Sequence, residues 1–220
     1  MKGSSAKENI LKKIRQALAN PVPVPFPHSE GKSSVFQPLQ KDIEVEFAEN
    51  FSNLLGRFSF CTDEKELAAQ LIAFVSARPS AEIYCKDDTL VAMLQQNGYN
   101  HFNSNDLASC TAAITTCELL IARTGSILLS SAQAGGRTVS VYAPIHICIA
   151  YTNQLVYDIK EGLQILKEKY DGNLPSFITL ATGPSRTADI EKTLVVGVHG
   201  PKEVYLFLVE RNVQAINSAN

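Results

Sequence analysis

The sequence lacks the features of a membrane-spanning or exported protein. Its longest uninterrupted apolar run is the six residues Val204–Val209, whereas a membrane-spanning helix needs about 20. The first residues include lysine, glycine and serine rather than the apolar stretch of a signal peptide. The sequence therefore predicts a cytoplasmic protein with no membrane span.

Cysteine and histidine are too few and too scattered to predict a metal centre. No two of the five cysteines form a Cys-x-x-Cys, and no two of the four histidines lie at metal-ligating spacing. Cys85 and Cys148 lie in short apolar stretches, which favours small buried side chains over a catalytic thiolate. We therefore expect this chain to bind no metal and no iron–sulfur cluster.

Motifs for nucleotides and nucleic acids are also missing. The sequence has no Gly-x-Gly-x-x-Gly, no Walker loop and no Gly-x-Ser-x-Gly. It has no tryptophan, and 20 Lys and Arg against 22 Asp and Glu give a formal net charge of −2. Such a chain has no general electrostatic attraction to nucleic acid.

What the sequence does contain divides it at about residue 38. One face of a predicted N-terminal helix carries Ile10, Leu11, Ile14 and Leu18. Prolines at positions 21, 23, 25 and 27 then favour an extended polyproline conformation. We predict an N-terminal helix and proline-rich arm over residues 1–38, followed by an α/β domain over residues 39–220. The helix would pack on a partner or on a second copy of the chain; the alternative is a frayed terminus.

The predicted domain alternates between amphipathic helices and short apolar strands. Helical spacing of apolar residues predicts helices over residues 42–55, 63–75, 90–96 and 155–172. Apolar runs predict strands over residues 58–61, 82–85, 119–122, 126–130, 139–142, 145–150, 177–180 and 204–209. The early alternation indicates a mainly parallel sheet flanked by helices, and the successive strands between residues 118 and 151 indicate a small inserted antiparallel sheet.

Two polar turns carry the candidate chemistry, and the first lies between two predicted strands. It consists of Thr124, Gly125 and Ser126. A tight link of this kind can present backbone N–H groups to an anion. The alternative is a plain hairpin turn.

The second turn, Gly183–Glu191, follows the apolar strand that ends at Leu180. Its candidate ligand-binding residues are Gly183, Ser185, Arg186 and Thr187, because a glycine-containing turn after a strand can hold a carboxylate or phosphate and arginine adds a two-pronged donor. The candidate catalytic residues are Asp189, Glu191 and His199, which could move protons. The alternatives are a helix N-cap by Ser185 or Thr187, an incidental Arg–Asp pair and a structural histidine.

These segments resemble a known family. Gly183-Pro-Ser-Arg-Thr-Ala-Asp-Ile-Glu191 and Gly197-Val-His-Gly-Pro201 resemble the signature of the lactate utilization protein C family, the LUD-domain proteins. The Thr124–Ser126 turn and Gly135-Gly136-Arg137 resemble that family's middle region. The resemblance covers about residues 40–210 and is most specific in the C-terminal signature.

The resemblance implies a fold, a function and partners. The fold would be NagB/RpiA/CoA transferase-like, that is, similar to glucosamine-phosphate deaminase, ribose-phosphate isomerase and the CoA transferases. The protein would be one subunit of a cytosolic complex that supports oxidation of L-lactate to pyruvate. The iron–sulfur clusters would belong to its partner subunits.

Three hypotheses for the function stay open at this point. In the first, the chain is a subunit of a lactate-oxidising complex and binds a small anion, with Arg186 holding its carboxylate. In the second, it is a non-catalytic scaffold whose N-terminal helix and arm clamp the iron–sulfur subunits. In the third, it is a stand-alone isomerase or acyl-transfer enzyme for phosphorylated or CoA-linked substrates, which fold analogy alone supports.

Overall fold

A computed structural model describes residues 6–19, 38–187, 195–197 and 199–211. Contacts along the chain divide it into two units, Met1–Pro38 and Leu39–Asn220. In the first unit, helix α1 (Ala6–Ala19) exposes the four apolar residues that the sequence places on one face. None of the helices in the described ranges is long and apolar enough to cross a membrane.

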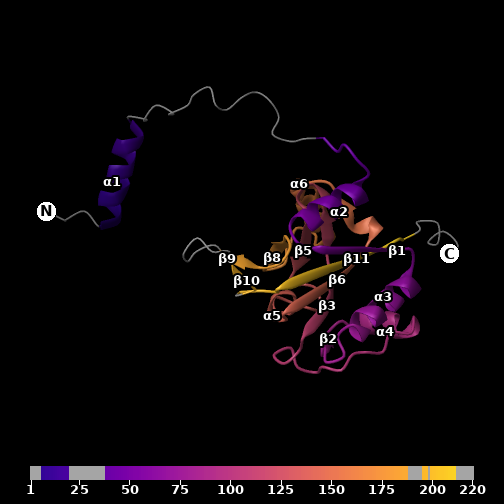
Figure 1. The fold of residues 1–220 in the computed structure, drawn as a ribbon. Coiled ribbons are helices and arrows are strands. Elements are labelled where there is room, and N and C mark those ends of the chain that lie inside the picture. Colours follow the sequence, from indigo (N-terminus) through magenta and orange to yellow (C-terminus); the bar gives the residue numbers. More distant parts are fainter. Residues whose placement is uncertain (1–5, 20–37, 188–194, 198, 212–220) are drawn as a thin grey trace. The chain divides into compact units, whose positions relative to one another are not determined.

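Five parallel strands form the main sheet of the second unit, in the order β1-β11-β6-β3-β2. The strands are β1 (Arg57–Cys61), β11 (Glu203–Val209), β6 (Ile145–Tyr151), β3 (Ala112–Thr116) and β2 (Ile83–Cys85). Each neighbouring pair is parallel, as the aligned arrows in Figure 1 show. All five carboxyl ends therefore lie along one edge of the sheet.

Helices α3 (Glu64–Ser76) and α4 (Asp88–Gln96) pack on one face of the main sheet (Figure 1). Helix α3 begins where the sequence predicts, because the Asp63 side chain accepts a hydrogen bond from the Glu66 backbone N–H. The Glu66 carboxylate in turn accepts one from the Thr62 backbone N–H. The first bond satisfies a free donor of the first turn, and the second ties the residue before the N-cap to the helix.

Helix α2 (Ile43–Asn53) packs on the opposite face of the main sheet. Its Phe47 and Phe51 are fully buried, and their rings stack with centroids 5.5 Å apart. They belong to the same buried cluster as Leu206 and Leu208 of β11. Burial of each phenylalanine contributes about 1.5–3 kcal/mol, so α2 is firmly held.

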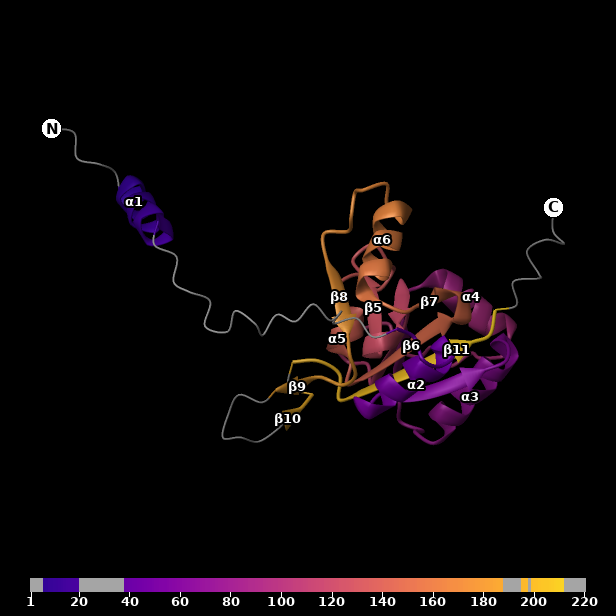
Figure 2. The same ribbon diagram turned by 90° about the horizontal axis from the view of Figure 1, so that it is seen from above.

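A small sheet shares this face with α2, in the order β7-β4-β5-β8. Its strands are β7 (Leu155–Val156), β4 (Leu119–Ile121), β5 (Ser126–Ser130) and β8 (Ile178–Ala181). Strand β5 is antiparallel to β4 and β8, whereas β7 is parallel to β4, so the sheet is mixed. Helix α6 (Ile159–Lys169) covers its outer side, as Figure 2 shows.

The remaining elements are short. They are the 3-10 helices η1 (Ala122–Thr124) and η2 (Thr152–Gln154), helix α5 (Val139–Tyr142), and the paired strands β9 (Arg186–Thr187) and β10 (Val195–Val196). The predicted fold class, a mainly parallel α/β sheet flanked by helices with a small inserted sheet, is confirmed; the small sheet is mixed rather than wholly antiparallel, because β7 runs parallel to β4. The specific likeness to NagB, RpiA and the CoA transferases stays a prediction.

Two local predictions are wrong. The strand predicted over 139–142 is helix α5, in which the Tyr142 N–H bonds the Thr138 carbonyl; its valines favour a strand locally, but Val139 is buried by packing with Ala113 and Ala143. The helix predicted from Leu155 begins at Ile159, with Asp158 as its N-cap. Before it, β7 pairs with β4.

Candidate functional site

A cleft of about 400 Å³ opens at the carboxyl edge of the main sheet. Its walls come from the segments that follow β2, β3, β5, β6 and β11 and from the end of α6. The charged and aromatic side chains that line it include Asp87, Glu118, Tyr151, Lys169, Tyr170 and Arg211. Ligands of open α/β sheets bind outside the carboxyl ends of the strands, so this cleft is the leading candidate for a binding site.

A buried carboxylate organises one wall of the cleft. Glu118 accepts hydrogen bonds from the Ser130 hydroxyl at 2.6 Å, the Tyr170 hydroxyl at 2.7 Å and the Lys169 ammonium at 2.7 Å. Burial raises the pKa of Glu118, but the bonds from Lys169, Ser130 and Tyr170 outweigh that effect, and the net pKa is lowered. Glu118 is therefore ionised at neutral pH and ties β4, β5 and α6 together.

The lining of the cleft also includes a second cation, Arg211. The Arg211 guanidinium lies 4.9 Å from the centroid of the Tyr151 ring, and the Arg211 backbone N–H donates to the Thr152 hydroxyl. The Gln154 amide donates to the Cys117 carbonyl at 2.7 Å, which joins the ends of β3 and β6. The cleft thus has a fixed frame with ammonium and guanidinium groups at its walls.

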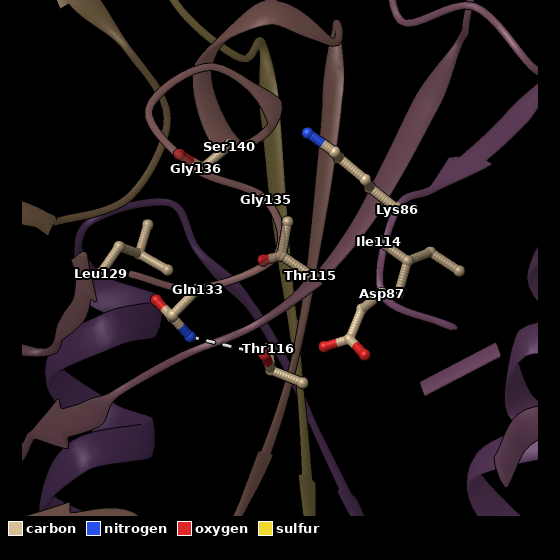
Figure 3. Close-up of a pocket in the computed structure, with 10 residues that line it drawn as sticks. All are labelled: Lys86, Asp87, Ile114, Thr115, Thr116, Leu129, Gln133, Gly135, Gly136 and Ser140. Carbon is tan, nitrogen blue, oxygen red and sulfur yellow. Dashed lines mark hydrogen bonds between the residues drawn. The ribbon is translucent and has the colours of Figure 1, made fainter. Parts of the chain in front are cut away.

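A chamber of about 10 Å³ adjoins the cleft (Figure 3). The two spaces share Asp87, Thr116 and Gln133 as lining residues. In Figure 3, Lys86 and Asp87 lie on one side of the chamber, and Leu129 and Gln133 on the other. This volume is enough for about one water molecule.

A buried histidine contacts one of the residues that line the chamber. His146 is fully buried, and its Nε2 lies 2.8 Å from the hydroxyl oxygen of Thr115, a residue that lines the chamber. Burial lowers the pKa of His146 to about 4, so the ring is neutral at pH 7. No sequence motif points to either residue; the one signal in the sequence is a lone histidine within an otherwise apolar strand.

The structure brings the two predicted polar turns together, away from this cleft. The Ser126 hydroxyl lies 2.8 Å from that of Thr124 and 2.9 Å from that of Thr182, next to Gly183. Gly125 has φ +58°, and a Cβ there would lie 2.5 Å from the Phe51 backbone nitrogen. The first turn is therefore packed directly against α2.

The second turn also contacts α2. A Cβ at Gly183, where φ is +79°, would collide with the Leu54 carbonyl oxygen. The exposed Arg186 side chain donates to the same oxygen at 3.1 Å. The Ser185 backbone N–H donates to the Pro201 carbonyl at 2.9 Å, next to the loop that carries the exposed His199. These partners are structural, and a ligand-binding role for the turn stays a prediction.

For four other predicted site residues, the structure gives little or no side-chain geometry. Asp189 and Glu191 lie outside the described residues, as does the side chain of Thr187. His199 is exposed just before β11. Their proposed roles in proton movement and binding therefore stay predictions.

All five cysteines carry free thiols, and burial raises the pKa of several of them. It raises the pKa of Cys61 to about 12 and that of Cys85 to about 11. A contact with Cys148 together with burial raises the pKa of Cys117 well above its usual value. These three thiols stay protonated at neutral pH. Within the described ranges, no three His, Cys, Asp or Glu side chains are grouped to hold a metal ion.

Comparison with known proteins identifies related sequences. A sequence profile described as the LUD domain matches residues 43–209. A lactate utilization protein C of Bacillus licheniformis is 39% identical over 99 residues, which cover 44% of this chain and 41% of that protein. The corresponding protein of Bacillus subtilis is 34% identical over 112 residues, 50% of this chain and 46% of the relative. The matched region thus spans less than half the length of these two relatives.

Two further matches extend over more of the chain. An uncharacterized protein of Neisseria meningitidis is 26% identical over 219 residues, covering 93% of this chain and 94% of that protein. The crystal structure of a DUF162 family protein from Deinococcus radiodurans superposes with a TM-score of 0.55 at 18% identity, over 78% of this chain and 99% of that one. At that identity the second match shows a shared fold.

Proposed function

The chain belongs to the LUD domain family, and on that premise we propose that it takes part in lactate utilization. The observation that carries this proposal is its similarity to proteins named for that process, at 34–39% identity over about half the chain. Within that role, the chain is a subunit that supports oxidation of L-lactate to pyruvate by binding a small carboxylate anion.

The carboxyl-edge cleft is the site we propose for this anion. Arg211 and the adjoining Lys86 supply positive charge there, and charged hydrogen bonds from such groups contribute about 1.5–3 kcal/mol each. The Lys169 ammonium in the same cleft is paired with the Glu118 carboxylate. The volume of about 400 Å³ exceeds what a three-carbon acid fills. The cleft therefore leaves room beside the acid for water or for a group from a partner.

The electrons from lactate would leave through other subunits. We propose that iron–sulfur partner subunits hold the clusters, as the family resemblance implies, and that this chain contributes binding and positioning. The cysteine spacing supports this division, because no two of the five cysteines form the Cys-x-x-Cys pair typical of cluster ligands.

A scaffold role is the second candidate, and helix α1 favours it. Ile10, Ile14 and Leu18 are 59%, 48% and 73% exposed on α1. An apolar stripe of this kind fits a helix that packs on a partner subunit or on a second copy. In that case, loss of α1 would impair lactate utilization while anion binding by residues 39–220 stayed intact.

Growth on L-lactate as the carbon source tests the proposal. A strain of the native organism without this chain should fail to grow, and the wild-type gene should restore growth. Lys86→Gln should restore it poorly, whereas Lys65→Gln, at an exposed position on α3, should restore it fully. Normal growth of the deletion strain would contradict the role in lactate utilization. Full rescue by Lys86→Gln at normal protein level would contradict the cleft as the site.

A further inference from the structure

We propose that the chamber beside Thr115 is a subsite for one carboxylate oxygen of the ligand in the cleft, and that buried His146 aims the Thr115 hydroxyl into it. This inference rests on the proposed function in one respect only: the ligand is an acid. His146 would be a positioning residue that acts through Thr115.

The size and place of the chamber set what it can hold. Its volume of about 10 Å³ admits about one oxygen-sized atom. Gly135 closes one side: a Cβ there would lie 3.4 Å from Cγ2 of Thr115. Since the chamber shares three lining residues with the cleft, the rest of a bound ligand would extend into the larger space.

The hydrogen bonding of His146 fixes the direction of the Thr115 hydroxyl. The neutral ring has one N–H, and its Nδ1 is buried with no hydrogen-bond partner among the residues that the structure describes. A buried N–H left unpaired is rarer in proteins than an under-satisfied acceptor. The proton therefore belongs on Nε2, where it is donated to the Thr115 oxygen 2.8 Å away.

This tautomer leaves the Thr115 hydroxyl proton free to point into the chamber. The hydroxyl oxygen already accepts from His146, so its own O–H is available as a donor. A hydrogen-bond acceptor in the chamber would extend the series of hydrogen bonds from His146 through Thr115 to the ligand. The buried, uncharged histidine thus serves to orient a donor.

Two further groups favour an anion as that acceptor. The Lys86 ammonium and the Ser140 hydroxyl line the same chamber, and neither forms a hydrogen bond or ion pair with any described residue. In Figure 3 the Lys86 side chain extends toward the side formed by Gly135 and Ser140. Asp87 is the opposing charge, but its carboxylate caps α4 by accepting from the Leu90 N–H at 3.1 Å. Two hydroxyl donors and one cation around a one-atom space fit a carboxylate oxygen.

The tautomer of His146 is the first test, and it needs no ligand. Nitrogen-15 NMR of the full chain, with His146→Asn used to assign the signal, should show His146 protonated on Nε2 and unprotonated on Nδ1. A proton on Nδ1 would overturn the inference, because Nε2 would then accept the Thr115 hydrogen and the hydroxyl would point away from the chamber.

The second test is calorimetric titration of acetate, pyruvate, L-lactate and inorganic phosphate. Thr115→Val should weaken carboxylate binding about 10–150-fold, and Thr115→Ser should recover most of it. Thr89→Val, at an exposed position on α4, is the matched control and should bind like the wild type. Unchanged affinity in Thr115→Val, or no binding of any carboxylate by the wild type, would overturn the subsite.

The same titrations distinguish failure of this inference from failure of the proposed function. Thr115-dependent binding of acetate without binding of lactate or pyruvate would support the subsite and contradict the proposed ligand. Equal lactate binding by wild type and Thr115→Val would support the proposed function and contradict the subsite.

Discussion

The guanidinium of Arg186 donates a hydrogen bond of 3.1 Å to the backbone carbonyl oxygen of Leu54, at the C-terminal end of α2. Carbonyls at the end of a helix have no partner within the helix, and a cation stabilises them. The polar turn that the sequence predicts as an anion site therefore has a structural task, which is to close the end of α2 whose phenylalanines fill the core.

Replacement of Arg186 should affect stability more than binding. We expect Arg186→Ala to lower the free energy of unfolding by about 0.5–1.5 kcal/mol, because an exposed side chain loses one hydrogen bond to the Leu54 carbonyl. Urea unfolding measures this, and pyruvate affinity should stay within threefold of the wild type. Lost affinity with unchanged stability would instead favour the turn as the anion site.

The close approach of Gly183 to α2 gives a second prediction. Gly183→Ala should destabilise the protein by about 3 kcal/mol or more, since the new methyl group meets the Leu54 carbonyl in addition to the backbone strain. Gly172 is the matched control: its φ of +78° equals that of Gly183 within a degree, but a Cβ there meets nothing within 4 Å. Gly172→Ala should cost only about 1–2 kcal/mol. Equal decreases in the melting temperatures of the two variants would show that the end of α2 does not restrict the space at Gly183.

Local sequence patterns predicted most of the fold but not the cleft. The spacing of Phe47 and Phe51 and the cap at Asp63 are local, and helices α2 and α3 follow from them. Strand β3 was missed because Ala112–Thr116 is short, rich in small side chains and without alternation.

The missed site residues depend on long-range pairing. Thr115 and His146 are 31 positions apart and meet only because β3 pairs with β6. The polar character of the 183–191 turn was visible in the sequence, but its partner Leu54 lies 132 positions away from Arg186. A single sequence does not show which distant residues meet. A polar turn with a structural task therefore cannot be distinguished, from sequence, from a polar turn that binds a ligand.

The carboxylate of Glu118 supplies a third prediction. We expect Glu118→Gln to lower the free energy of unfolding at pH 7 by about 1–3 kcal/mol, because the charge that receives the bonds from Lys169, Ser130 and Tyr170 is removed. The folded-state pKa of Glu118 lies below its usual 4.5, so the wild-type advantage is complete above that pH. It should disappear as the pH falls through the lowered pKa. A difference between the two proteins that stays constant down to pH 3 would contradict this role.

Burial of neutral His146 should make the stability of the protein depend on pH over a separate range. Its pKa falls from 6.5 to about 4 in the folded protein, so below pH 6.5 the unfolded chain takes up a proton that the folded chain does not. Stability should therefore decline between pH 6.5 and about 4, by about 3 kcal/mol in total. Urea unfolding of wild type and His146→Asn at several pH values measures this. The variant should show a shallower decline, and parallel curves would mean that His146 is not held neutral by the fold.

The central claim is that a carboxylate binds at the carboxyl edge of the main sheet and not at the Arg186 turn. The most direct test is calorimetric titration of pyruvate into the wild type, Lys86→Gln and Arg186→Gln, two variants that each remove one exposed cation. We expect Lys86→Gln to bind at least about 10-fold more weakly, because it loses a charged hydrogen bond, and Arg186→Gln to bind within threefold of the wild type. Weakened binding in Arg186→Gln with full affinity in Lys86→Gln would contradict the claim.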